Sequence, residues 1–230
     1  MPRIFQGPAV KGSQKWIQKL INEKPDLLTS LVRTQLGIPH PDNIAWLSPL
    51  AEDEYAEYQD QAFIDLPNIK LPNVSLSDFW PSRGPVWDGL GRSETGTAFL
   101  VEAKSHISEV LSPKTGAREK SLKKIKKSLD DTKTFLHSSS EHDWSSIFYQ
   151  YTNRLAHLYL LRSLNEVPAY LVFVYFVNDN DMNGPTSIDE WNGALSLLTS
   201  YLGRGRHRLK QYIADIFIDI CQIGVSTSLM

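Results

Sequence analysis

Cysteine is almost absent from this sequence, and so are the features that direct a chain to a membrane. Cys221 is the single cysteine among 230 residues, which excludes a disulfide framework and a cysteine-rich zinc site. We expect it to lie in a buried strand. The N-terminal residues lack the apolar core of a secretory signal peptide. The longest apolar run, residues 167–177, is about half of what a membrane-spanning helix needs. The prediction is a cytoplasmic protein without a membrane partner.

A strong excess of one charge is also lacking. Lys and Arg total 24, Asp and Glu total 26, and the formal net charge is −2. This balance excludes nucleic-acid binding by bulk basicity, although it leaves local basic patches open. Hydrophobic residues at 41% and charged residues at 22% are typical of a soluble globular protein. The length fits one domain, or one domain with a helical extension.

Helix signals come first along the chain. Ser13 is a helix-capping residue type, and Pro25 and Gly37 have the positions expected at the start and the end of a second helix. We expect these helices to form an N-terminal arm over residues 1–45, followed by a core over residues 46–230. The core is predicted to begin with an acidic helix over residues 49–63. A proline-rich loop over residues 65–85 follows it.

The remaining core alternates between strand and helix patterns. A glycine near 96 and a short connection predict a hairpin of strands, followed by two helices, a strand, a helix and a strand. The core order is therefore α–β–β–α–α–β–α–β. Such an order predicts an α/β protein of the α+β kind, with a mixed sheet covered by helices. The expected elements after the loop are strands 86–92 and 97–107, helices 117–136 and 145–164, strand 167–177, helix 187–202 and strand 215–223.

Two carboxylates and a lysine are brought together by this hairpin. Glu102 and Lys104 project to one side of their strand because side chains alternate along a strand. A turn at residues 93–96 places Asp88 beside residues 101–102 of the partner strand. Neighbouring carboxylates disfavour each other's ionisation, and a bridging cation relieves the conflict.

Mg²⁺ or Mn²⁺ suits this set of side chains. Mg²⁺ prefers oxygen ligands and often takes one or two protein carboxylates, so that waters and phosphate oxygens fill the other positions. The main-chain carbonyl of Ala103 is a further candidate ligand. Lys104 would orient the attacking water and stabilise negative charge on the phosphate. The alternative is a solvated hairpin face. Against it, Glu102 ends an apolar run, where charge is costly.

The pattern Asp88…Glu102-Ala-Lys104 resembles the motif of the PD-(D/E)XK superfamily, the restriction-endonuclease-like nucleases. The resemblance covers about residues 45–225, and Trp87 stands where the family has a proline. It implies a restriction-endonuclease-like core in which Asp88 and Glu102 are metal ligands and Lys104 is the catalytic lysine. It also implies a further glutamate on the first core helix. The candidates are Glu54 and Glu57, and we prefer Glu57 because tyrosines flank it.

The predicted helix at 145–164 carries a polar stripe. Gln150, Asn153, Arg154 and His157 recur at helical spacing between largely apolar positions. The stripe resembles the glutamine-bearing helix of exonuclease-like branches of the superfamily. Gln150 would then orient the lysine or the water, and Arg154 would contact a phosphate. A polar seam between helices explains the same pattern equally well.

Two basic clusters are candidate contacts to nucleic acid. They lie at residues 120–127, with Lys123 and Lys124, and at residues 204–210, with Arg206. Solvated helix faces explain such clusters as well. The leading prediction is a Mg²⁺-dependent nuclease that acts on DNA. The alternative is a catalytically inactive module on the same fold that binds nucleic acid or protein. The sequence leaves open DNA against RNA, and the oligomeric state, a dimer included.

Overall fold

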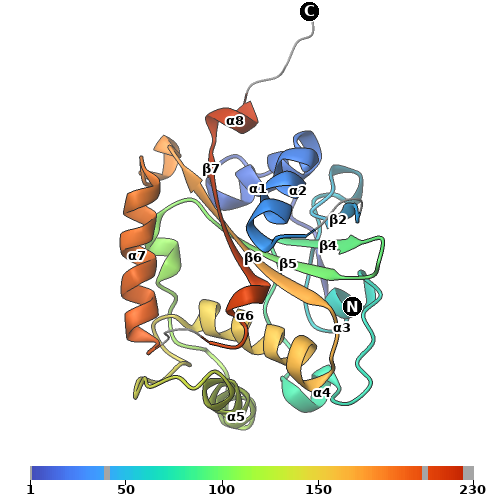
Figure 1. Ribbon diagram of the computed structural model, residues 1–230, viewed down its shortest axis with the longest axis vertical. Helices are drawn as coiled ribbons and strands as arrows, with labels where there is room; N and C mark the ends of the chain where they lie inside the picture. The colour runs from blue at the N-terminus through green and yellow to red at the C-terminus, as the bar shows by residue number, and fades with distance from the viewer. Residues whose placement is uncertain (1, 39–41, 204–206, 225–230) are drawn as a thin grey trace, which may run out of the picture.

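A computed structural model of the chain describes residues 2–38, 42–203 and 207–224, and its centre is a mixed five-stranded sheet (Figure 1). The first three strands in the order are antiparallel, and the last three are parallel. Helices cover both faces, so the protein is of mixed α/β class. The strand order is β2 (Ile44–Ser48), β4 (Gly89–Ser93), β5 (Ala98–Lys104), β6 (Ala169–Val177) and β7 (Ile213–Asp219).

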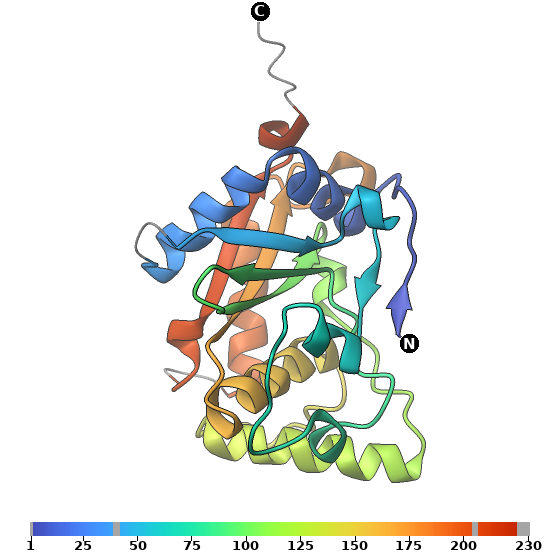
Figure 2. The same cartoon turned by 90° about the vertical axis from the view of Figure 1, so that its right-hand side faces the viewer.

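Helices α1 (Gly12–Glu23) and α2 (Pro25–Leu36) cover one face of the sheet (Figure 2). Pro25 opens α2, and Gly37 ends it with a φ of 64°. Apolar side chains of both helices pack in one cluster with alternate side chains of β5 and β6. The segment expected to be an arm therefore shares its apolar cluster with the central sheet.

The opposite face is covered by α5 (Glu119–Phe135) and α6 (Tyr149–Tyr159), while α7 (Ile188–Tyr201) lies near the β7 side (Figures 1 and 2). A π-helical turn at Leu160–Leu164 continues α6. The alternation along β5 decides which side chains meet these helices. Phe99, Val101 and Ala103 belong to the cluster under α1 and α2, whereas Leu100 belongs to the α6 side. Glu102 has the same parity as Leu100, so it faces α6.

The predicted order from the hairpin onward is confirmed, but the predicted helix at 49–63 is wrong. This segment forms a turn η1 (Ala51–Asp53), a strand β3 (Glu57–Tyr58) and a short helix α3 (Gln61–Asp65). Glu54, Tyr55 and Asp60 have φ values of 53°, 52° and 51°, which a right-handed helix does not allow. Strand β3 instead pairs with β1 (Arg3–Ile4) at the N-terminus.

Three smaller expectations also need correction. Strand β2 lies in a stretch to which no element was assigned, although Ile44, Trp46 and Ser48 alternate into the interior. The proline-rich loop contains a short helix α4 (Leu76–Phe79). Cys221 is exposed and begins α8 (Cys221–Gly224), because Asp219 accepts a hydrogen bond from its backbone N–H and closes a turn after β7. Within the described residues, no helix combines the length and apolarity that crossing a bilayer requires.

Candidate functional site

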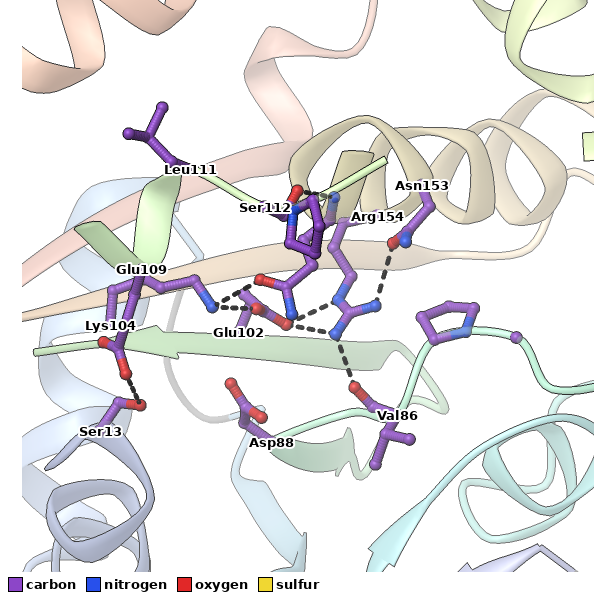
Figure 3. A pocket seen from close by; sticks show the side chains of 14 residues that line it. Ser13, Val86, Asp88, Glu102, Lys104, Glu109, Leu111, Ser112, Asn153 and Arg154 are labelled. Atoms are coloured by element: carbon purple, nitrogen blue, oxygen red, sulfur yellow. Dashed lines mark hydrogen bonds and ion pairs between the residues drawn. The ribbon is translucent and has the colours of Figure 1, made fainter. Parts of the chain in front are cut away.

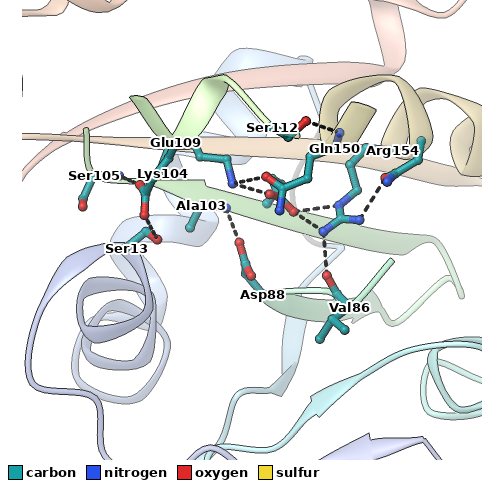
Figure 4. Close-up of polar contacts among 12 residues, drawn as sticks. Ser13, Val86, Asp88, Ala103, Lys104, Ser105, Glu109, Ser112, Gln150 and Arg154 are labelled. Atoms are coloured by element: carbon teal, nitrogen blue, oxygen red, sulfur yellow. Dashed lines mark hydrogen bonds and ion pairs between the residues drawn. The ribbon is translucent and has the colours of Figure 1, made fainter. Parts of the chain in front are cut away.

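The β4–β5 hairpin brings Asp88 next to the Glu102–Lys104 segment. Gly89 pairs with Val101, so Asp88, which directly precedes β4, lies opposite Glu102. The backbone N–H of Ala103 donates a 2.7 Å hydrogen bond to Oδ2 of Asp88 (Figure 4). The placement of Asp88 follows the expectation from the hairpin. Because Ala103 packs toward α1 and α2, its side chain lies away from the face that carries Glu102.

Glu102 is a buried carboxylate held between two cations. Its exposed fraction is 2%, and its two oxygens accept hydrogen bonds from Nζ of Lys104 and, at 2.7 Å, from Nε of Arg154. Burial acts to raise the pKa of Glu102, but the neighbouring Arg154 and Lys104 hold this pKa below its ordinary value. Glu102 is therefore ionised, and it does not belong to a solvated hairpin face.

The pKa of Asp88 is shifted in the opposite direction, above its ordinary value. Burial and the negative charge of Glu102 raise the pKa of Asp88 to about 8, against the opposing effect of Lys104. The carboxyl group is partly open to a cleft of 520 Å³, and Glu102 and Lys104 line the same cleft (Figure 3). Asp88 can therefore gain or lose a proton near neutral pH at a place that solvent and small ions reach.

Arg154 is buried, and its guanidinium connects separate parts of the fold. It extends from α6 with an exposed fraction of 3%, and its guanidinium lies 4.7 Å from the ring centre of Trp87. Its NH1 donates to Oδ1 of Asn153 at 3.0 Å, and its NH2 donates to the carbonyl of Val86 at 2.6 Å. These bonds and the ion pair to Glu102 use every nitrogen of the guanidinium. The residue expected to contact a phosphate instead connects α6 to the segment before β4 and fixes Glu102.

Gln150 lies where the polar stripe predicts, at the start of α6 and beside Lys104. Its Oε1 accepts a 3.3 Å hydrogen bond from Nζ of Lys104, and its backbone N–H donates to Oγ of Ser112 at 2.9 Å. Lys104 therefore has two acceptors, Glu102 and Gln150, which hold its ammonium group at the cleft. Burial acts to lower the pKa of Lys104, but Glu102 and Asp88 raise it above the ordinary value, so the group is charged.

Glu57 lies near this group, on a strand and not on the expected helix. Its carboxylate is 6% exposed and accepts hydrogen bonds from the side chains of Gln6, at 2.7 Å, and Gln14, at 3.2 Å. Burial raises the pKa of Glu57, and the charge of Glu102 adds to this effect. Glu54 is exposed after the η1 turn. Of the two candidate glutamates, Glu57 is the one that interacts with the site.

Two further predicted residues, Lys123 and Lys124, do not line the cleft. Lys123 forms an ion pair with Glu119 at 3.0 Å on the exposed side of α5, and Lys124 donates to the carbonyl of Ser77 at 2.7 Å. Arg206 lies outside the described residues.

Several cleft residues were missed by sequence reasoning. Glu109 accepts hydrogen bonds from Ser13, at 3.0 Å, and from the backbone N–H of Ser105, at 2.6 Å. It caps the turn η2 (Ile107–Val110). The three-residue spacing of His106 and Glu109 is a capping signal that could have indicated this turn.

The acids of the cleft outnumber its bases. Asp88, Glu102 and Glu109 line it together with Lys104 and Arg154. No three side chains of the types His, Cys, Asp and Glu form a metal-binding group within the described residues. A divalent ion here would therefore take few protein ligands and complete its shell with water, as Mg²⁺ commonly does.

Comparisons of the chain with protein-family models, with curated proteins and with solved structures give no match. Function must therefore be inferred from the chemistry of this cleft.

Proposed function

We propose that this chain is a metal-dependent nuclease that hydrolyses DNA phosphodiesters at the cleft. The observation that carries the proposal is the meeting of Asp88, Glu102 and Lys104 at one wall of an open cleft. The strand and helix order from β4 to β7 supports the resemblance to restriction-endonuclease-like nucleases. In this proposal Asp88 and Glu102 hold Mg²⁺ or Mn²⁺, the carbonyl of Ala103 is an additional ligand, and Glu57 supports the site from β3.

The residues present fit such an ion. The donor set is made of oxygen atoms, which Mg²⁺ and Mn²⁺ prefer. Asp88 lies opposite Glu102 and both line the cleft, so an ion bound by Asp88 would lie beside the Glu102 carboxylate. Once Asp88 is ionised, the acids lining the cleft exceed its cations, and a divalent cation offsets this negative charge and that of a phosphodiester. A bound ion would supply a water of lowered pKa and would offset charge on the phosphate.

The chain's own residues have separate roles in this proposal. The ammonium group of Lys104 donates hydrogen bonds toward the reacting phosphate and its attacking water, and it stabilises the negative charge that develops. Gln150 keeps the ammonium group at the cleft through its 3.3 Å hydrogen bond. Arg154 fixes the Glu102 carboxylate through Oε2, while Lys104 binds Oε1.

The test is cleavage of labelled single-stranded and double-stranded DNA in Mg²⁺, in Mn²⁺ and in a chelator. Glu102→Ala and Lys104→Ala should each lower the rate by at least about 100-fold. Lys70→Met, an exposed lysine away from the cleft lining, is the matched control and should retain the wild-type rate. Circular dichroism checks that each variant folds. Activity that survives both cleft substitutions, or that persists in chelator, would overturn the assignment.

One observation favours a second candidate, a catalytically inactive module on the same fold. Lys104 and Arg154 already neutralise Glu102 without any added ion. A site whose charges are already balanced can bind a partner without catalysing a reaction. Calorimetric titration with Mg²⁺ and Mn²⁺ discriminates the two functions, because the nuclease needs binding that Asp88→Asn weakens. Heats that show no binding would favour the module.

A further inference from the structure

A pair of exposed apolar side chains flanks the cleft. Ser112 and Phe148 form an isolated parallel bridge, and both are buried. Their preceding neighbours, Leu111 and Ile147, are 54% and 47% exposed. Leu111 and Ile147 thus lie on adjacent segments, and their side chains are exposed while Ser112 and Phe148 are buried.

The pair is continuous with the candidate site. Leu111 lines the same cleft as Glu102 and Lys104, and Figure 3 shows it at the edge of the cleft, pointing away from the carboxylates. Ser112 connects the two regions, because its N–H donates to the carbonyl of Ile147 at 2.7 Å and its Oγ accepts from the N–H of Gln150. Ile107, 40% exposed, begins the η2 turn, and Leu111 directly follows that turn. We call Ile107, Leu111 and Ile147 the apolar rim.

We propose that the apolar rim contacts unpaired nucleobases next to the phosphodiester in the cleft, so that the substrate is single-stranded or locally unpaired nucleic acid. This inference rests on the proposed function. Exposed apolar clusters of this kind mark interaction sites. Apolar side chains offer nothing to a phosphate, but they pack against the exposed faces of bases. In a duplex those faces are covered by stacking, so unpaired bases are the part of a nucleic acid that fits.

The charges of the cleft also favour binding through bases over binding through phosphates. Proteins that grip the backbone of a nucleic acid, single-stranded or duplex, do so with free Lys and Arg side chains. Lys104 and Arg154, the cations of this cleft, are both engaged by Glu102. Apolar contacts to bases would then supply a larger share of the affinity than phosphate contacts. We expect a shallow dependence of binding on salt concentration.

The experiment measures binding separately from cleavage. Fluorescence anisotropy with the full-length Lys104→Met variant in Mg²⁺, and with the wild-type chain in chelator, compares oligonucleotides of equal length. The probes are a single strand, a blunt duplex and a duplex with an unpaired overhang. The single strand and the overhang should bind about tenfold more tightly than the blunt duplex. The double variant Leu111→Ala/Ile147→Ala should lose about tenfold for the unpaired probes, because two partly covered side chains together bury about as much apolar surface as one fully buried side chain.

Leu197→Ala is the matched control, since Leu197 is 67% exposed on α7 and lies outside the cleft lining. Its affinity should equal that of the parent. Equal binding of single strand and duplex, or an unchanged affinity in the rim variant, would overturn the inference. Evidence that the apolar rim binds a protein and not nucleic acid would also overturn it. Rim-dependent binding without any cleavage would support the rim and overturn the nuclease. Cleavage that is insensitive to the rim variant on every probe would overturn the rim alone.

Discussion

Asp88 and Glu102 face each other across the β4–β5 hairpin, and the protein stabilises their charges differently. Glu102 accepts from Lys104 and from Arg154, whereas Asp88 accepts from the backbone N–H of Ala103. The pKa of Glu102 is consequently low, and the pKa of Asp88 is raised to about 8. Glu102 is therefore ionised at neutral pH, whereas Asp88 changes its charge near neutral pH.

The first prediction concerns stability between pH 6.5 and pH 8. The unfolded pKa of Asp88 is near 3.8 and the folded pKa is about 8, so the native state holds a proton that the unfolded chain releases. The free energy of unfolding should therefore fall as the pH rises through this range. Because Asp88 is partly open to the cleft, we expect a slope below the limit of about 1.4 kcal/mol per pH unit. Urea denaturation at several pH values measures it.

Asp88→Asn is the control for this prediction. The amide keeps an oxygen that accepts from Ala103 but carries no proton to lose, so the slope should become shallower. His157 does not disturb the comparison. Burial lowers the pKa of His157 to about 3, so its effect is a loss of stability as the pH falls below 6.5. Equal slopes for the wild-type chain and Asp88→Asn would refute the raised pKa.

The second prediction concerns protons released on metal binding. A divalent ion binds the ionised form of Asp88, which at pH 7 is the minor form of a group with a pKa of about 8. Mg²⁺ binding should therefore release up to about one proton. Calorimetry in two buffers of different ionisation enthalpy measures the release from the difference in heat. Asp88→Asn should bind Mg²⁺ more weakly and release less. Identical heats in both buffers would contradict the prediction.

The elements that could be predicted from the sequence are those with a strong local pattern. The apolar strand β6 and the polar stripe of α6 both follow from periodicity, and the hairpin follows from its glycine and short turn. The helix predicted at residues 49–63 is wrong because Glu54 and Tyr55 have positive φ values, which redirect the chain into β3. That conformation depends on pairing with β1, more than fifty residues earlier, which a local pattern does not reveal.

The candidate site could also be predicted only in part from local patterns. Strand alternation was enough to place Glu102 beside Lys104, and the hairpin placed Asp88 opposite them. The bond from Arg154 to Glu102 joins residues 52 positions apart and depends on how α6 packs across the sheet. Sequence spacing therefore identified Arg154 as polar on the correct helix face and left a phosphate contact and a polar seam open, but it did not reveal the buried Glu102 carboxylate as its partner.

The third prediction concerns the different contributions of Lys123 and Lys124 on α5 to stability. Lys124 donates to the carbonyl of Ser77, so Lys124→Met should lower the free energy of unfolding by about 0.5–1.5 kcal/mol. The exposed ion pair of Lys123 with Glu119 contributes little, so Lys123→Met should leave stability within about 0.5 kcal/mol. Urea denaturation measures both. If α5 meets a nucleic-acid backbone, Lys123→Met should also reduce the salt dependence of binding. Equal stability losses would contradict the assignment of Lys124 as the structural lysine.

The fourth prediction concerns the Arg154–Glu102 ion pair. Arg154→Met leaves the Glu102 carboxylate buried with one cation fewer, and breaking a buried pair costs about 3–5 kcal/mol. Adding Glu102→Gln removes the unpaired charge, so the double variant should lose less than the sum of the single losses. Urea denaturation at pH 7 gives this cycle. Arg162→Met, which removes a guanidinium 3.6 Å from the Tyr212 ring centre, is the control and should cost about 1 kcal/mol or less. An Arg154→Met loss no larger than that would show that Glu102 does not depend on Arg154.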